Sequence, residues 1–111
     1  MKDIIFDNFQ NDVDESLLRH RSILDIMTKL NESNARINRA LVKSVTNCGC
    51  IEISAKKQTT FNDENSLNHS LSNEIQGTLC NNCRDTIETE IGNNIFYLTS
   101  LCNCLDLNLY D

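Results

Sequence analysis

Proline and tryptophan are absent from this chain of 111 residues, and glycine occurs only three times. Because few residues interrupt a regular backbone, the sequence leaves room for long helices. Aromatic residues make up only 5% of the chain, so the core must consist mainly of leucine, isoleucine and valine. We expect a single helical domain over residues 1–111, with a core small enough for an added cross-link to matter.

Long apolar runs are missing too. No segment approaches the roughly 20 apolar residues that a membrane-spanning helix needs, and acidic residues interrupt the short N-terminal run, unlike in a signal peptide. We therefore expect a cytoplasmic protein without a membrane partner. The net charge of −6 disfavours nucleic acid as a partner, because phosphate backbones repel an acidic chain.

Apolar residues recur at helical spacings in two long segments. Residues 14–45 predict a long N-terminal helical segment, in which the polar residues 31–34 are either a break or part of one continuous helix. Residues 82–105 predict a long C-terminal helix. The first stripe contains Val13, Leu17, His20, Ile23, Leu24, Ile26, Met27 and Leu30, and the second contains Ile87, Ile91, Ile95, Leu98, Cys102 and Leu105. We expect the two stripes to pack antiparallel, and a dimer would complete a bundle.

The segments around these helices carry weaker patterns. The alternation in residues 51–53 predicts a short strand. Leu67, Leu71 and Ile75 predict a short helix capped by Gly77. Residues 1–11 are expected to form a loose N-terminal arm, and residues 56–65 a flexible polar loop. The predicted fold class is thus all-α: a small helical bundle of two long helices and a short one, with cysteines pinning the connection.

Two close cysteine pairs, Cys48/Cys50 and Cys80/Cys83, are separated by 29 residues. Cytosolic thiols stay reduced, so such pairs indicate metal or redox chemistry rather than disulfides. Four thiolates suit a closed, tetrahedral, structural zinc site. A redox dithiol, an iron–sulfur site and buried apolar thiols are the alternatives.

The remaining candidate residues carry weaker signals. Cys102 and Cys104 are read as a core thiol and an incidental one. A basic stripe formed by Lys29, Arg36, Arg39 and Lys43 could meet a phosphate-bearing ligand, but a solvated face is the simpler interpretation. The sequence contains no Ser-His-Asp arrangement, no Walker loop and no dinucleotide-binding fingerprint.

The segment Glu90-Ile91-Gly92-Asn93, followed by Phe96-Tyr97 and a leucine-rich turn, resembles the second metal-binding helix of MazG-like all-alpha nucleotide pyrophosphohydrolases. The resemblance covers about the last fifth of the chain. It implies Mg²⁺-dependent nucleotide hydrolysis with Glu90 as the candidate catalytic residue and Asn93 beside it. The chain departs from the family at Asn93, where the family has Asp, and it lacks the upstream Glu-x-x-Glu. The whole chain also resembles small bacterial proteins of uncharacterised function with similar cysteine pairs.

Three functional hypotheses follow. The first is a non-catalytic, zinc-stabilised interaction or regulatory protein of the bacterial cytosol, acting through a protein partner or self-association. The second is a diverged MazG-like nucleotide pyrophosphohydrolase or nucleotide-binding protein that uses Mg²⁺. The third is a thiol redox sensor.

Overall fold

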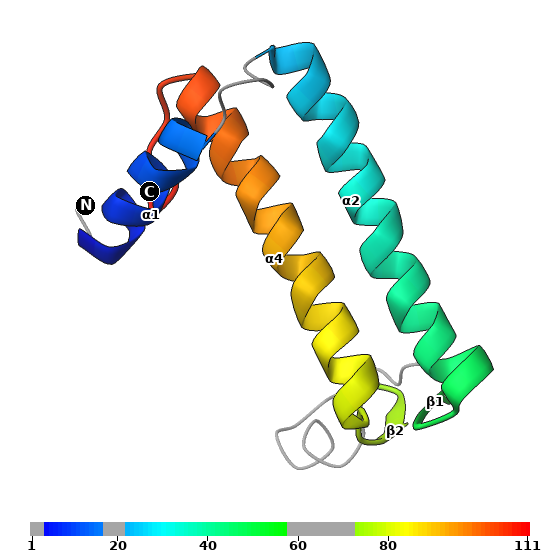
Figure 1. The fold of residues 1–111 in the computed structure, drawn as a ribbon. Coiled ribbons are helices and arrows are strands. Elements are labelled where there is room, and N and C mark those ends of the chain that lie inside the picture. Colours follow the sequence, from blue (N-terminus) through cyan, green and yellow to red (C-terminus); the bar gives the residue numbers. More distant parts are fainter. Residues whose placement is uncertain (1–3, 17–21, 58–72) are drawn as a thin grey trace, which may run out of the picture.

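Two long helices dominate the computed structural model, which describes residues 4–16, 22–57 and 73–111. Helix α2 (Ile23–Lys43) and helix α4 (Asn81–Cys104) lie side by side and run in opposite directions (Figure 1). The fold is therefore mostly helical, as predicted. None of the helices in the described part of the chain has the length and apolar composition that a membrane crossing requires.

Helix α2 passes through residues 31–34 without a break, which settles the alternative that the sequence left open. It continues into a turn of π-helix, η1 (Ser44–Cys48). Gly49 ends this turn with φ of 77°, a left-handed conformation that glycine adopts without steric cost. Its backbone N–H donates to the Ser44 carbonyl at 2.9 Å, which satisfies one of the carbonyls at the helix end.

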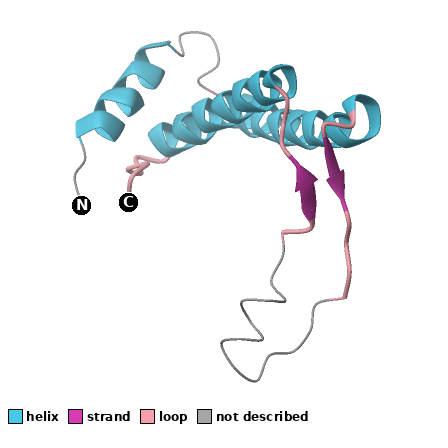
Figure 2. Cartoon of the chain, turned by 90° about the horizontal axis from the view of Figure 1, so that it is seen from below, coloured by secondary structure: helices cyan, strands magenta, loops and turns pink. Residues whose placement is uncertain are grey.

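A small antiparallel sheet follows (Figure 2), in which β1 (Ile51–Ile53) pairs with β2 (Ile75–Gly77). The predicted strand over residues 51–53 is confirmed. The predicted short helix is wrong at its described end, because Ile75 lies in β2 and Gly77 is a strand residue rather than a helix cap. A spacing of four residues also fits the two-residue period of a strand, and pairing with β1 decides between the two. Leu67 and Leu71 lie outside the described residues, as does most of the predicted loop over residues 56–65.

The predicted loose arm is wrong over residues 4–11, because helix α1 (Ile4–Ser16) begins there and contacts α4. Residues 1–3 lie outside the described part of the chain. Val13 is only 3% exposed. The C-terminal residues hold α1 in place: Gln10 donates from Nε2 to the Leu107 carbonyl at 2.7 Å and accepts from the Leu109 N–H at 3.0 Å. These bonds join residues far apart in sequence, which local patterns do not reveal.

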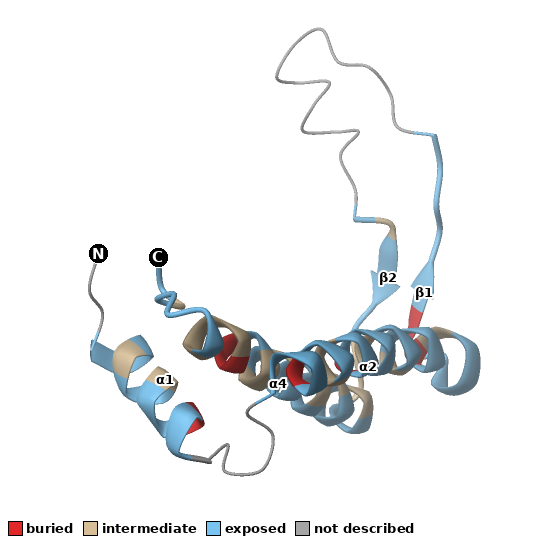
Figure 3. Ribbon diagram, turned by 90° about the horizontal axis from the view of Figure 1, so that it is seen from above, coloured by how far each residue is buried: buried red, intermediate tan, exposed pale blue. Residues whose placement is uncertain are grey.

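The described residues contain very little apolar core (Figure 3). Only Val13, Ile26 and Ile51 are buried apolar side chains. The other buried side chains are small and polar, namely Ser33, Ser44, Thr99 and Ser100. Much of the apolar stripe predicted on each long helix remains exposed instead of packing, so the expected antiparallel contact between the two stripes is wrong for those positions.

Candidate metal centre

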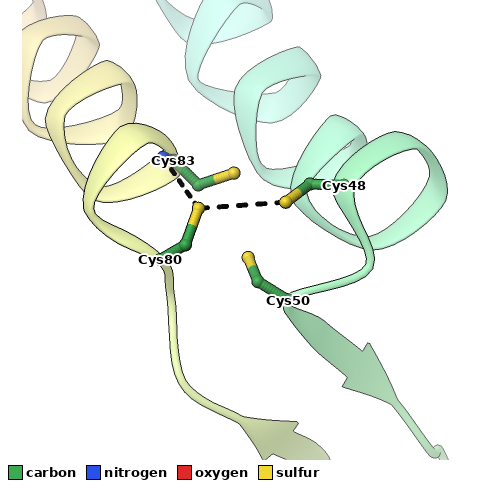
Figure 4. A group of neighbouring side chains, drawn as sticks. All are labelled: Cys48, Cys50, Cys80 and Cys83. Carbon is green, nitrogen blue, oxygen red and sulfur yellow. Dashed lines mark hydrogen bonds between the residues drawn. The ribbon is translucent and has the colours of Figure 1, made fainter.

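Four cysteine side chains meet where α2 ends and α4 begins (Figure 4). The Sγ atoms of Cys48, Cys50, Cys80 and Cys83 all lie within 4.8 Å of one another. The structure therefore brings together the two pairs that the sequence singles out. The described residues include all six cysteines, and no two of them form a disulfide.

The sulfur atoms have the spacing of a metal-coordination sphere. A tetrahedron with Zn–S bonds of about 2.3 Å has edges of about 3.8 Å. The Sγ atoms of Cys48 and Cys80 are 3.8 Å apart. Four converging sulfurs could thus bind one metal ion, and this donor set suits zinc or iron.

The first pair is positioned by the end of the π-helical turn. Cys48 is the last residue of η1, and Gly49 reverses the chain so that Cys50 also faces the cluster. The Cys50 Sγ lies 3.8 Å from the Ser44 carbonyl oxygen. If the helix continued past Cys48, the side chains of Cys48 and Cys50 would point about 200° apart around its axis. The left-handed Gly49 ends the helix and lets the two thiols converge.

The second pair is positioned by the start of α4. Cys80 is the N-cap residue, and its Sγ accepts a hydrogen bond from the Cys83 backbone N–H at 3.4 Å. Cys83 lies in the first turn of the helix. The N–H groups at a helix N-terminus carry partial positive charge, so this position favours thiolates over thiols.

The sheet holds the two turns against each other. Cys50 immediately precedes β1 and Cys80 follows the end of β2 by three residues, so the pairing of Ile51 with Gly77 brings the two cysteine pairs together. Gly77 has φ of 89°, and a Cβ added there would lie 2.7 Å from the Cys50 carbonyl oxygen. Only glycine fits at this point without moving the Cys50 backbone.

The crowded sulfurs influence one another's ionisation. The Cys83 backbone N–H lowers the pKa of Cys80 to about 7. The side chain of Ser44 lowers the pKa of Cys83, but the Cys80 sulfur, desolvation and the other two sulfurs together raise it to about 12. The pKa of Cys48 is also raised: the Cys83 side chain and the Cys50 backbone lower it, but the Cys80 and Cys50 sulfurs and desolvation outweigh them. Cys80 therefore ionises readily, whereas Cys48 and Cys83 resist ionisation in the absence of a cation.

Ser44 is absent from the sequence-based predictions although it contacts the cluster. Its carbonyl faces Cys50, and its buried hydroxyl donates to the Ala40 carbonyl at 3.0 Å. The one sequence signal for this role is that Ser44 is a small residue one helical turn before the first cysteine. Cys102 and Cys104 lie near the opposite end of α4, half-buried and exposed respectively, and take no part in the cluster.

Glu90 lies on α4 beside a cavity of about 380 Å³ that opens next to the cluster. The cavity is also lined by the cations Arg36, Arg39 and Lys43 from α2. The Oε2 atom of Glu90 is buried and has no hydrogen-bond partner among the described residues. Asn93 faces a different, smaller pocket. Glu90 belongs to no group of three or more metal-ligating side chains in the described part of the chain, where the four cysteines form the one such group.

Comparison with protein-family models, curated proteins and solved structures finds no match to this chain. The resemblance to MazG-like pyrophosphohydrolases therefore stays a prediction.

The first test concerns the glycine between the strands. We expect Gly77→Ala to destabilise the protein by about 1–3 kcal/mol, because alanine is strained at positive φ and its Cβ meets the Cys50 carbonyl. Gly92→Ala is the matched control. It lies inside α4 with nothing within 4 Å of an added Cβ, so it should stabilise by about 0.5–1 kcal/mol. Urea denaturation of both variants measures the difference, and equal stability of the two would contradict this account of the turn.

The second test concerns protons released on metal binding. At pH 7 the thiols of Cys48 and Cys83 are protonated, because the pKa of each is raised. Both must become thiolates to bind a metal, so binding of Zn²⁺ should release at least these two protons. Affinity should accordingly rise with pH and fall on acidification. Calorimetric titration in buffers of different ionisation enthalpy counts the protons, and a count below two would show that the cluster does not bind through all four thiolates.

Proposed function

We propose that the protein is a non-catalytic, zinc-stabilised interaction protein of the bacterial cytosol. The observation that carries the proposal is the convergence of four Sγ atoms within 4.8 Å of one another. Four thiolates close a tetrahedral zinc site and leave no position for a water molecule or a substrate. Zinc in such a site stabilises structure and does not catalyse.

The lean core explains why zinc would matter to this chain. Structural zinc in small domains contributes about 10–16 kcal/mol of apparent binding free energy at neutral pH. This is as large as the whole folding free energy of a typical domain, about 5–15 kcal/mol. The described residues bury only three apolar side chains, so few other interactions in this part of the chain could stabilise the fold to the same extent.

The exposed surface supports an interaction role. Large apolar side chains on both long helices are about 40% exposed, including Met27 at 43% and Ile95 at 42%. Exposed apolar side chains that gather on one face mark sites of protein association. The cluster would fix the relative position of the two helices that carry this surface.

The test is elemental analysis of the full chain purified without oxygen. We expect one zinc ion per chain, and the Cys83→Ser variant should lose most of it, because a hydroxyl replaces one of four thiolate ligands. Cys104→Ser is the matched control, since this thiol is exposed and lies about 31 Å along α4 from Cys83. Its zinc content should equal that of the wild type.

Two other results would overturn the zinc proposal. Iron with visible charge-transfer absorption would identify an iron–sulfur site instead. Absence of metal, together with reversible formation of a disulfide within the cluster at cytosolic potentials, would identify a redox sensor, for which the lowered pKa of Cys80 would supply the attacking thiolate.

A second candidate function, Mg²⁺-dependent hydrolysis of a nucleotide, is favoured by the cavity beside Glu90. Three cations around a cavity of about 380 Å³ could bind phosphate groups, and the partnerless buried carboxylate oxygen of Glu90 could bind a cation. This function is the second candidate because Glu90 belongs to no group of three or more possible metal ligands among the described residues.

A panel of nucleoside triphosphates tests the second candidate by release of pyrophosphate. If it holds, Glu90→Gln should lower turnover about 100-fold or more, because the variant loses the carboxylate charge. Glu88→Gln is the control: it changes an exposed carboxylate on the same helix that does not line the cavity, and should keep full turnover. Turnover that both variants retain, or none in the wild type, would rule this candidate out.

A further inference from the structure

Each long helix carries two neighbouring seams, of which the helix pair uses only one. The buried seam of α2 follows Ile26, Ser33, Ile37, Ala40 and Ser44, and that of α4 follows Cys83, Ile87, Glu90, Asn94 and Tyr97. Beside them runs a second seam with the same spacings of three, four or seven residues, in which the polar Asn34 occupies the position between Leu30 and Leu41. We call it the apolar face: Ile23, Met27, Leu30 and Leu41 on α2, and Ile91, Ile95 and Leu98 on α4 together with the C-cap residue Leu105.

The apolar face is largely exposed. On α2, Ile23, Met27 and Leu41 are 40%, 43% and 37% exposed. On α4, Ile91, Ile95, Leu98 and Leu105 are 42%, 42%, 39% and 50% exposed. Spacings that alternate between three and four residues are those of helices packed in coiled coils and four-helix bundles. A hairpin of two helices needs one such seam per helix, whereas a four-helix bundle needs two.

Both parts of the apolar face lie on the same side of the helix pair. Viewed along each helix from its N-terminus, the exposed seam is rotated about the helix axis in the same direction from the buried seam. Because α2 and α4 are antiparallel, equal rotations bring the two seams to one side of the layer. The cavity residues Arg36, Arg39 and Thr86 are rotated in the other sense and line the opposite, polar side.

The proportions of the molecule indicate that this side is covered by another helical layer. Stable domains bury their apolar faces between at least two layers, and here α2 and α4 form one. The Cα radius of gyration is 18.5 Å, whereas a compact domain of this length has about 13 Å. The chain alone is therefore more open than its length requires.

A second copy of the chain fits this face in size and pattern. Helices of 21 and 24 residues present a face about 30 Å long and about 20 Å wide, or about 600 Å² in projection. Stable interfaces bury about 800 Å² of accessible surface per partner, and accessible surface exceeds projected area. An identical layer also has the same heptad-like spacing, so the seams of two copies can interdigitate.

One polar pair links the apolar face of α2 to the buried seam of α4 near the middle of both helices. Asn94 donates from Nδ2 to the Asn34 Oδ1 at 2.6 Å, halfway along both helices. Asn34 occupies a seam position between Leu30 and Leu41. Single asparagines at seam positions fix register and oligomeric state in helical bundles at some cost in stability.

We infer that two copies of the chain associate through the apolar faces of α2 and α4 to form a four-helix bundle. This inference deepens the proposed interaction function, on which it rests, by naming the partner as a second copy.

The test uses the full chain, loaded with zinc, in light scattering after size-exclusion chromatography and in sedimentation equilibrium. The wild type should have twice the 12.7 kDa mass of one chain. Ile95→Glu should raise the dimer dissociation constant about 100-fold, because a charge would be buried in the contact. Val42→Glu is the matched control, since Val42 is similarly exposed at 45% but points away from the apolar face. It should leave the mass unchanged.

Helical circular dichroism and zinc content are measured on the same samples. If Ile95→Glu loses helical signal, Met27→Glu tests the same face from α2. A wild type that is monomeric at about 100 µM, well above the Kd of a specific dimer, overturns the inference. The apolar face would then bind another protein or another part of this chain. Equal dissociation by Val42→Glu and Ile95→Glu also overturns it. A dimer that contains no zinc would retain the inference and refute the zinc proposal.

Discussion

The convergence of four sulfurs at one point is the constraint on which the structure depends. The end of α2 and the start of α4 are joined there, yet ionisation of Cys80 opposes ionisation of Cys83, whose pKa is about 12. A bound cation would favour ionisation of both thiols, because each thiolate would become a ligand. Under the zinc proposal, closing the helix pair and binding the ion are therefore one event.

The backbone around the cluster is specialised because short ligand spacings demand it. A left-handed Gly49 turns the first pair inward, the N-cap position of Cys80 supplies an N–H to its sulfur, and Gly77 lets the strands approach. Each device acts within a few residues of its cysteine. Together they bring the pairs close enough that β1 and β2 need only three residues each.

Local patterns predicted the features that local chemistry determines. The cysteine cluster, strand β1 and helix α4 were predicted from signals within a few residues, and all three are present in the structure. The failures depend on distant partners. Helix α1 is held by residues about a hundred positions later, through Gln10 and Asn108, and β2 exists because β1 is there to pair with it. No single-sequence pattern could show that the glutamate-bearing flank of α4 lines a cavity with cations of α2.

Polar residues occupy much of the buried seam between α2 and α4, whereas the most apolar residues lie on the neighbouring, exposed seam. Ser33, Ser44 and Glu90 face the partner helix, and the Ser33 hydroxyl and one Glu90 oxygen lack hydrogen-bond partners among the described residues. Burying such groups costs about 1–3 kcal/mol each, so this seam contributes little to stability. The apolar side chains of Met27, Ile91 and Ile95 could have supplied a stronger seam, yet they occupy the neighbouring one. The most apolar residues thus lie outside the contact between the two helices, and the four thiols join the helices at one end only. Such a helix pair is suited to gain its remaining stability from a molecule that binds to its apolar face.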